Sequence, residues 1–213
     1  MDHYTRPEWD RSALITIDTQ EDFTRADGAA CIAGTVEVLP TIQCLLSAYR
    51  EKRLPIIHVV RLYKNDGSNA DICRRSLVEG GRSIVSPGST GSELAAELRP
   101  LEYSQLDATV LLQGHLQEIG AKEWAIYKPR WGAFYATKLA EHLRLIRVTT
   151  IVVVGCNFPN CPRMTIYEAS ERDLRVVVVS DAISGIYDRG INELRAIDVQ
   201  VLPAAEVVRA VKV

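Results

Sequence analysis

Short apolar runs alternate with longer amphipathic segments along almost the whole chain. Apolar runs rich in β-branched residues predict strands at residues 13–17, 55–60, 150–154 and 176–179. Weaker strand candidates are residues 124–127 and 199–202. Apolar residues recur with helical spacing at residues 36–52, 91–98, 133–145, 162–173, 189–196 and 204–211.

This alternation predicts a mainly parallel sheet covered by helices, because parallel neighbours need crossover connections and cannot be joined by hairpins. We expect an α/β fold over residues 1–213, a single domain built as a three-layer α/β/α sandwich with a roughly six-stranded, Rossmann-like sheet. Residues 62–90 and 101–122 fit neither period and contain Gly and Ser clusters. We interpret these two segments as loops or lids beside a functional site.

Composition and charge narrow the class of protein. A chain of 213 residues with 47% hydrophobic residues is long enough to bury a sizeable core. Its 25 basic and 27 acidic residues are mixed along the chain, so we expect no nucleic-acid partner and no membrane partner. The first residues are charged and aromatic, unlike a secretory signal, which favours a cytoplasmic location.

The five cysteines are an odd number, and a reducing compartment disfavours structural disulfides. The four histidines show no close pairing, and Cys156 and Cys161 do not form a CxxC pair. We therefore expect no metal site and no cofactor, and each thiol has to be judged separately.

Three reactive side chains follow apolar runs, at the carboxyl ends of predicted strands where ligands bind in open parallel sheets. They are Asp18, Lys128 and Cys161. Pro162 is typical of a first helical position, which places Cys161 at the helix N-cap, where the macrodipole and Lys128 would favour the thiolate. Taken singly, each residue has a structural alternative: a buried cysteine, a capping aspartate and a solvated lysine.

Taken together, four motifs resemble those of the isochorismatase-like cysteine hydrolases, the family of nicotinamidases, N-carbamoylsarcosine amidohydrolases and ureidoacrylate or biuret hydrolases. The resemblance covers most of the chain. The motifs are LITIDTQEDF around Asp18, KPRWGAF from Lys128, VVVGCNFPNC ending at Cys161, and VVVSDA ending at Ala182.

The resemblance implies that Cys161 is a nucleophile, Asp18 a general base and acid, and Lys128 a cation that lowers the pKa of the thiol. It also implies a cis peptide bond between Cys156 and Asn157, with the Asn157 and Cys161 N–H groups as an oxyanion hole. The expected activity is hydrolysis of a C–N bond in a small amide, ureido compound or cyclic amide through a thioester. Relatives of this kind self-associate, so a homo-oligomer, dimer or tetramer, is expected.

The chain departs from the family pattern where Phe158 replaces a threonine and Pro162 replaces a valine, which leaves the substrate open. The segment that carries metal-binding histidines in nicotinamidases is different here. Two alternatives remain: an ether hydrolase of the isochorismatase type that uses Asp18 without the thiol, and a non-catalytic binding protein.

Substrate contacts are expected from several residues near the three reactive side chains. Arg61, Arg74 and Arg75 flank a loop, and a guanidinium group is well suited to binding a carboxylate or imide oxygen of a substrate. The alternative is that they are surface arginines on a mobile loop. The candidate substrate-binding residues are Gln20, Arg61, Trp131, Phe134 and Phe158.

Overall fold

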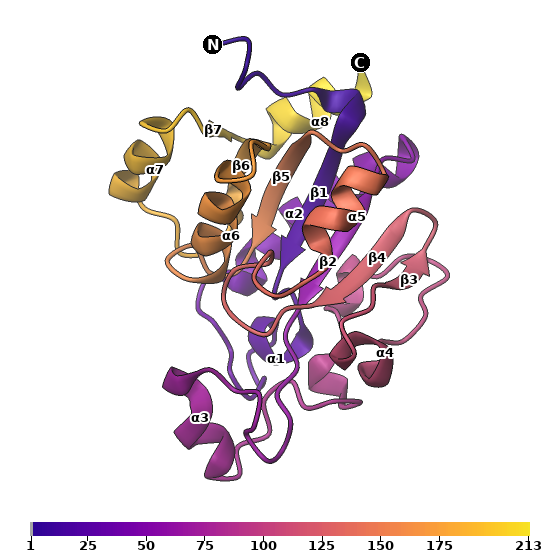
Figure 1. The fold of residues 1–213 in the computed structure, drawn as a ribbon, viewed down its shortest axis with the longest axis vertical. Coiled ribbons are helices and arrows are strands. Elements are labelled where there is room, and N and C mark those ends of the chain that lie inside the picture. The colour runs from indigo at the N-terminus through magenta and orange to yellow at the C-terminus, as the bar shows by residue number, and fades with distance from the viewer. Residues whose placement is uncertain (1) are drawn as a thin grey trace.

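A computed structural model describes residues 2–213; Met1, the first residue of the expected domain, lies outside the described residues. A seven-stranded sheet forms its centre (Figure 1). The strands are β1 (Ser12–Ile17), β2 (Ile56–Val60), β3 (Gln117–Gly120), β4 (Glu123–Tyr127), β5 (Thr150–Gly155), β6 (Arg175–Ile183) and β7 (Gln200–Leu202).

The strand order is β3-β4-β2-β1-β5-β6-β7, and every neighbouring pair is parallel except β3 with β4. The mainly parallel α/β sheet is therefore confirmed, with one strand more than expected. β3 escaped prediction because this short edge strand, Gln-Glu-Ile-Gly, carries little apolar or β-branched character.

Helices cover both faces of the sheet (Figure 1). They are α1 (Glu21–Thr24), α2 (Thr35–Glu51), α3 (Ile72–Glu79), α4 (Ala108–Leu112), α5 (Leu139–Leu145), α6 (Cys161–Ser170), α7 (Asp188–Arg195) and α8 (Ala204–Lys212). Within the described residues no helix is long and apolar enough to span a bilayer.

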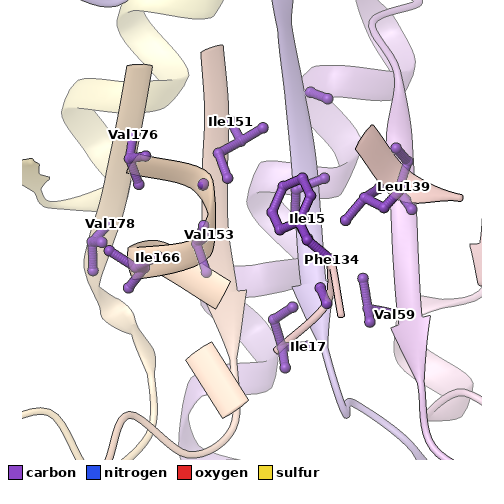
Figure 2. Close-up of a cluster of buried hydrophobic side chains, with 14 of the residues drawn as sticks. Ile15, Ile17, Val59, Phe134, Leu139, Ile151, Val153, Ile166, Val176 and Val178 are labelled. Atoms are coloured by element: carbon purple, nitrogen blue, oxygen red, sulfur yellow. The ribbon is translucent and has the colours of Figure 1, made fainter. Parts of the chain in front are cut away.

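Two apolar layers hold the sandwich together. One face of the sheet packs under α5 and α6, where Ile15, Val153, Val178, Leu139 and Ile166 meet (Figure 2). Alternate residues of the same strands face α2 and α8 on the other side. Because successive side chains of a strand point to opposite faces, a central strand with helices on both sides must be apolar throughout, as β5 is.

Close contact between β1 and β5 requires a glycine at the end of β5. Gly155 has φ +117°, and a Cβ at this position would lie 2.2 Å from the carbonyl oxygen of Ile17. The Cys156 N–H donates to the same carbonyl at 2.9 Å. Gly155 therefore lets the chain after β5 approach the chain after β1.

Two predicted helices are corrected. Residues 91–98 form two 3₁₀ turns, Thr90–Ser92 and Ala96–Leu98, because Leu94 between them pairs with Gln20 in an antiparallel bridge. Residues 133–138 precede α5 as a loop. The Ala133 and Phe134 N–H groups donate to the Thr165 and Glu168 side chains of α6, so they do not belong to a helix of their own.

The two segments interpreted as loops are partly regular. Residues 62–90 contain α3, and residues 101–122 contain α4 and β3. Figure 1 shows α3 beyond the carboxyl ends of the central strands, on the side of the molecule where α1 lies. The segment 62–90 thus covers the edge of the sheet where a ligand is expected.

Candidate active site

The structure brings together the three reactive side chains predicted from the sequence. Asp18 directly follows β1, Lys128 directly follows β4, and Cys161 begins α6 after β5. Lys128 Nζ lies 2.8 Å from Asp18 Oδ2 and donates a hydrogen bond to Cys161 Sγ at 3.2 Å. One ammonium group thus links a carboxylate and a thiol at the carboxyl edge of the sheet.

The backbone at Asp18 turns sharply to aim its carboxylate at this point. Asp18 has φ +51°, in the left-handed region that few residues other than glycine adopt. Its N–H donates to the Val59 carbonyl at 3.0 Å, and its own carbonyl accepts from Cys156 Sγ at 3.0 Å. Contacts from β2 and from the chain after β5 therefore hold Asp18 in this conformation.

Lys128 is fully buried, with a relative exposure of 0%. An ammonium group in such a place is very costly unless it is paired with an anion and hydrogen-bonded. The Asp18 carboxylate, itself buried, supplies that charge. Lys128 is therefore held as part of a buried ion pair rather than as a solvated surface charge.

The Cys161 thiol is not held as a thiolate at rest. Burial and the nearby Asp18 carboxylate raise the pKa of the thiol to about 12, whereas Lys128 and Arg61 lower it. Lys128 thus acts on the pKa of the thiol in the expected direction, and burial and Asp18 outweigh it. The neutral thiol faces a carboxylate that can take its proton, because Asp18 Oδ1 is buried and has no hydrogen-bond partner within residues 2–213.

The sequence predicts Cys161 at the N-cap of the helix, but Cys161 is the first residue of α6. The Asn160 carbonyl accepts from the Met164 N–H at 3.0 Å, which makes Asn160 the N-cap and moves Pro162 to the second helical position. Proline is still tolerated there, because the first N–H groups of a helix have no partner within it.

The turn before Cys161 contains the expected cis peptide bond between Cys156 and Asn157. In the part of the chain that the structure describes, neither the Asn157 nor the Cys161 N–H donates to another protein group. Both residues line a cavity beside the thiol. Their amides are thus available to an oxygen atom bound in front of the thiol.

Asp18 and Cys161 line a cavity of about 240 Å³, and the buried Lys128 contacts both of them without lining it. This volume is below the roughly 300–1,000 Å³ of sites for drug-sized ligands, so the cavity suits a small molecule. Its lining comprises Asp18, Phe23, Ile32, Arg61, Tyr63, Cys73, Arg74, Trp131, Cys156, Asn157, Asn160 and Cys161. Among residues 2–213, no three His, Cys, Asp or Glu side chains are grouped so that they could hold a metal ion.

Arg61 and Trp131 of the expected substrate-binding set do line the cavity. The Arg61 guanidinium is itself engaged: it donates to Asp71 Oδ2 at 2.6 Å and to the Lys128 carbonyl at 3.0 Å, and it lies over the Tyr63 ring. Arg61 therefore joins the loop after β2 to the lysine segment and to the start of α3.

The other three candidates are corrected, because their side chains do not line this cavity. Gln20 is fully buried and bonds to backbone groups of Arg61 and Ser92, which ties the segment after β1 to its neighbours. Phe134 and Phe158 belong to the apolar core under α5 and α6. The Phe158 ring packs edge-on against Tyr187 with the ring centroids 5.4 Å apart.

Sequence reasoning missed several residues of the cavity wall. Phe23 belongs to the short helix α1 and Cys73 to α3, and Ile32 and Tyr63 lie in the loops after β1 and β2. The one local signal was Asp71, which precedes the short amphipathic stretch of α3 and is its N-cap residue. Aspartate is a preferred N-cap residue, so Asp71 before this stretch would have indicated a helix there, although its side chain makes no capping hydrogen bond.

Comparison with known proteins agrees with the fold and the motifs. A solved structure of an isochorismatase family protein from Desulfovibrio vulgaris subsp. vulgaris is similar with a TM-score of 0.81 and 31% identity, covering 96% of this chain and 100% of that chain. A probable inactive nicotinamidase of Arabidopsis thaliana is 27% identical over 82% of this chain and 81% of its own length. An N-carbamoylsarcosine amidase of Arthrobacter is 24% identical over 83% of this chain and 62% of its own length.

A mainly parallel sheet between two helical layers, with a small cavity at the carboxyl ends of its central strands, defines the general class: a three-layer α/β/α protein with a site suited to a small molecule. The family model for the isochorismatase domain matches residues 12–206, and the chain belongs to the isochorismatase-like hydrolase family.

Proposed function

We propose that the protein is a cysteine-dependent amidohydrolase that cleaves a C–N bond of a small molecule through a thioester on Cys161. One observation carries this proposal: a single buried ammonium, Lys128 Nζ, lies 2.8 Å from the Asp18 carboxylate and 3.2 Å from Cys161 Sγ, and both of these residues line the cavity. A base, a cation and a nucleophile are the groups that acyl transfer through a thiol requires.

In the first half of the cycle, Asp18 takes the thiol proton while Cys161 Sγ attacks the carbonyl carbon of the substrate. The raised pKa of Cys161 makes this transfer part of the attack and not a step that precedes it. The C–N bond of the tetrahedral intermediate then breaks, and Asp18 returns the proton to the leaving nitrogen. The products are ammonia or an amine and a thioester.

In the second half, Asp18 removes a proton from water, and the hydroxide attacks the thioester carbonyl. The C–S bond breaks, the acid leaves, and the proton held by Asp18 returns to Cys161 Sγ. Lys128 stays paired with Asp18 throughout and stabilises the negative charge that moves between the carboxylate and the sulfur.

The oxyanion of each tetrahedral intermediate needs hydrogen-bond donors that are already in place. The free N–H groups of Asn157 and Cys161 are the donors that we assign to it. The hydrogen bond from Lys128 holds Cys161 Sγ in one direction, which keeps the attacking atom close to the amide of the same residue.

The relatives support more than one outcome. The Arthrobacter relative is named an amidase, which favours C–N cleavage. The Arabidopsis relative is named an inactive nicotinamidase, which favours the alternative of a non-catalytic binding protein. The intact set of Asp18, Lys128 and Cys161 supports catalysis in this chain.

The test is a screen of small amides, ureido compounds and cyclic amides for the release of ammonia or amine. Cys161→Ala should reduce turnover by at least about 10⁴-fold and leave the fold unchanged, because no other group replaces the nucleophile. Cys44→Ala, an exposed cysteine on α2, is the matched control and should retain full activity.

An active Cys161→Ala protein would refute the thioester mechanism and would favour ether hydrolysis through Asp18. Binding of a small molecule without turnover by the native protein would favour the non-catalytic alternative.

We also propose that the protein is a homo-oligomer. Ile72, Tyr135 and Met164 are large apolar side chains with exposures of 88%, 57% and 42%, and all three line one surface hollow beside the cavity. Apolar patches of this kind mark interaction sites in soluble proteins.

A further inference from the structure

Helix α3 presents its two neighbouring arginines to different surroundings. Arg74 is half-buried and lines the cavity that contains Cys161. Arg75 is exposed, lies along the neighbouring surface hollow, and donates to the Ala70 carbonyl at 3.4 Å. The structure therefore separates two residues that the sequence leaves equivalent.

Three cationic side chains lie in or next to the cavity wall, and two of them are paired with carboxylates. The Lys128 ammonium is balanced by Asp18 at 2.8 Å, and the Arg61 guanidinium is balanced by Asp71 at 2.6 Å. Within the described residues, the Arg74 side chain forms neither an ion pair nor a hydrogen bond. Among the cations at the cavity, Arg74 is therefore the one that no carboxylate of the described residues pairs.

Buried hydrogen bonds to Asp71 hold the first turn of α3, which carries Arg74, in place. Asp71, the N-cap residue of α3, accepts hydrogen bonds from the Arg61 guanidinium at 2.6 Å and from the Tyr63 hydroxyl at 2.9 Å. These bonds hold the first turn of α3 against the loop after β2. Arg61 is thus a positioning residue, and Arg74, one turn along from Asp71, is the guanidinium free to meet a ligand.

The rest of the wall sets the shape of that ligand. Phe23, Ile32, Tyr63 and Trp131 give the cavity apolar and aromatic sides, and its volume is only about 240 Å³. A small body with few polar atoms fits between these side chains. An anionic group on such a body would be drawn to the one uncompensated guanidinium.

We propose that Arg74 is the specificity-determining residue of this site and binds the carboxylate of an anionic substrate, a small amide or ureido compound that carries a carboxylate away from the scissile carbonyl. The proposal rests on the proposed function for its scissile bond. A guanidinium binds a carboxylate through two parallel N–H···O bonds, and such charge-assisted pairs are stronger than neutral hydrogen bonds. Arg74 touches the substrate and takes no part in the proton transfers, which belong to Asp18.

The test compares pairs of compounds that differ only in one group: a small primary amide or ureido compound with a carboxylate, and the same compound with a hydroxymethyl group in its place. In the native protein the carboxylate member should have a kcat/KM at least about 10-fold higher, as expected for a hydrogen-bonded charge pair. Arg74→Ala should remove that preference mainly by raising KM for the carboxylate member, so that the ratio of the two kcat/KM values falls to about one. Arg74→Lys should keep part of the preference.

Arg75→Ala is the matched control, one residue along the same helix and outside the cavity, and it should leave both members unchanged. Equal kcat/KM values for the two members in the native protein, or an equal loss for both in Arg74→Ala, would overturn the proposal.

Binding to Cys161→Ala, measured by calorimetry, separates this proposal from the proposed function. We expect the carboxylate members to bind this variant more tightly than the neutral members, and Arg74→Ala in the same background to remove the difference. That result would support the role of Arg74 even if the native protein hydrolyses none of the compounds. If the native protein hydrolyses both members alike and Cys161→Ala shows no preference in binding, the proposed function stands and the role of Arg74 falls. Failure of every carboxylate member to bind would also refute the role of Arg74.

Discussion

At the scale of single residues, the Cys161 thiol is subject to two opposing influences. Burial and the Asp18 carboxylate favour the protonated form, and Lys128 and Arg61 favour the thiolate. The first pair prevails and raises the pKa to about 12. A raised pKa keeps the thiol protonated at neutral pH, so its attack on a substrate needs a base, the role that we propose for Asp18.

This balance predicts an unusual pH dependence for alkylation of the free protein. An acid whose pKa is raised stays protonated to higher pH, so the rate at which iodoacetamide modifies Cys161 should keep rising beyond pH 10. An ordinary thiol titrates near pH 8.5. The rates can be measured by mass spectrometry of the peptides, with exposed Cys44 in the same sample as the control. A rate for Cys161 that is already constant at pH 7–8 would mean that the resting site holds a thiolate.

The sequence predicted Asp18, Lys128 and Cys161 because each follows an apolar run, and the ends of parallel strands meet at one edge of a sheet. It failed for Phe134 and Phe158, whose rings enter the core. The direction of a side chain in a loop depends on packing against distant segments, and neighbouring residues along the chain do not reveal it.

At the scale of elements, the site depends on how closely the chain after β5 approaches β1. Gly155→Ala should lower the free energy of unfolding by more than about 3 kcal/mol, because its Cβ would lie 2.2 Å from the Ile17 carbonyl oxygen. Gly114→Ala is the matched control: Gly114 has φ +78°, and a Cβ there would meet nothing within 4 Å. Backbone strain alone should cost about 1–2 kcal/mol at this control position.

Urea unfolding of the two variants gives the comparison. An equal loss of stability in both would show that strain, and not the contact with β1, makes glycine necessary at position 155.

The helices and strands could be predicted where the apolar pattern extends over a long segment of the chain. The strands in the centre of the sheet and helices α2, α6, α7 and α8 lie within a few residues of their predicted ranges. Residues 91–98 have helical spacing but form two short turns, because the Gln20 side chain and the bridge to Leu94 bind the backbone there. Such long-range bonds override a local period, and a single sequence does not display them.

At the scale of the whole molecule, the fold is that of the isochorismatase-like hydrolases, and an apolar hollow lies on the surface beside the cavity. The proposed homo-oligomer predicts a sedimentation coefficient larger than that of a 23.7 kDa monomer at micromolar concentration. Ile72→Asp should shift the distribution toward the monomer if the hollow beside the cavity is the interface. Leu101→Asp, at an exposed leucine that does not line this hollow, is the control. A native protein that sediments only as a monomer would contradict the proposal.

The central claim is that Cys161 carries the acyl group during turnover, and trapping the acyl-enzyme tests it most directly. A reaction with a substrate found in the screen is stopped with acid, and the protein is digested and analysed by mass spectrometry. The account predicts that the mass of the acyl group appears on the peptide containing Cys161, is removed by hydroxylamine, and is absent from Cys161→Ala. Rapid turnover with the acyl group on another residue, or with undiminished activity in Cys161→Ala, would contradict it.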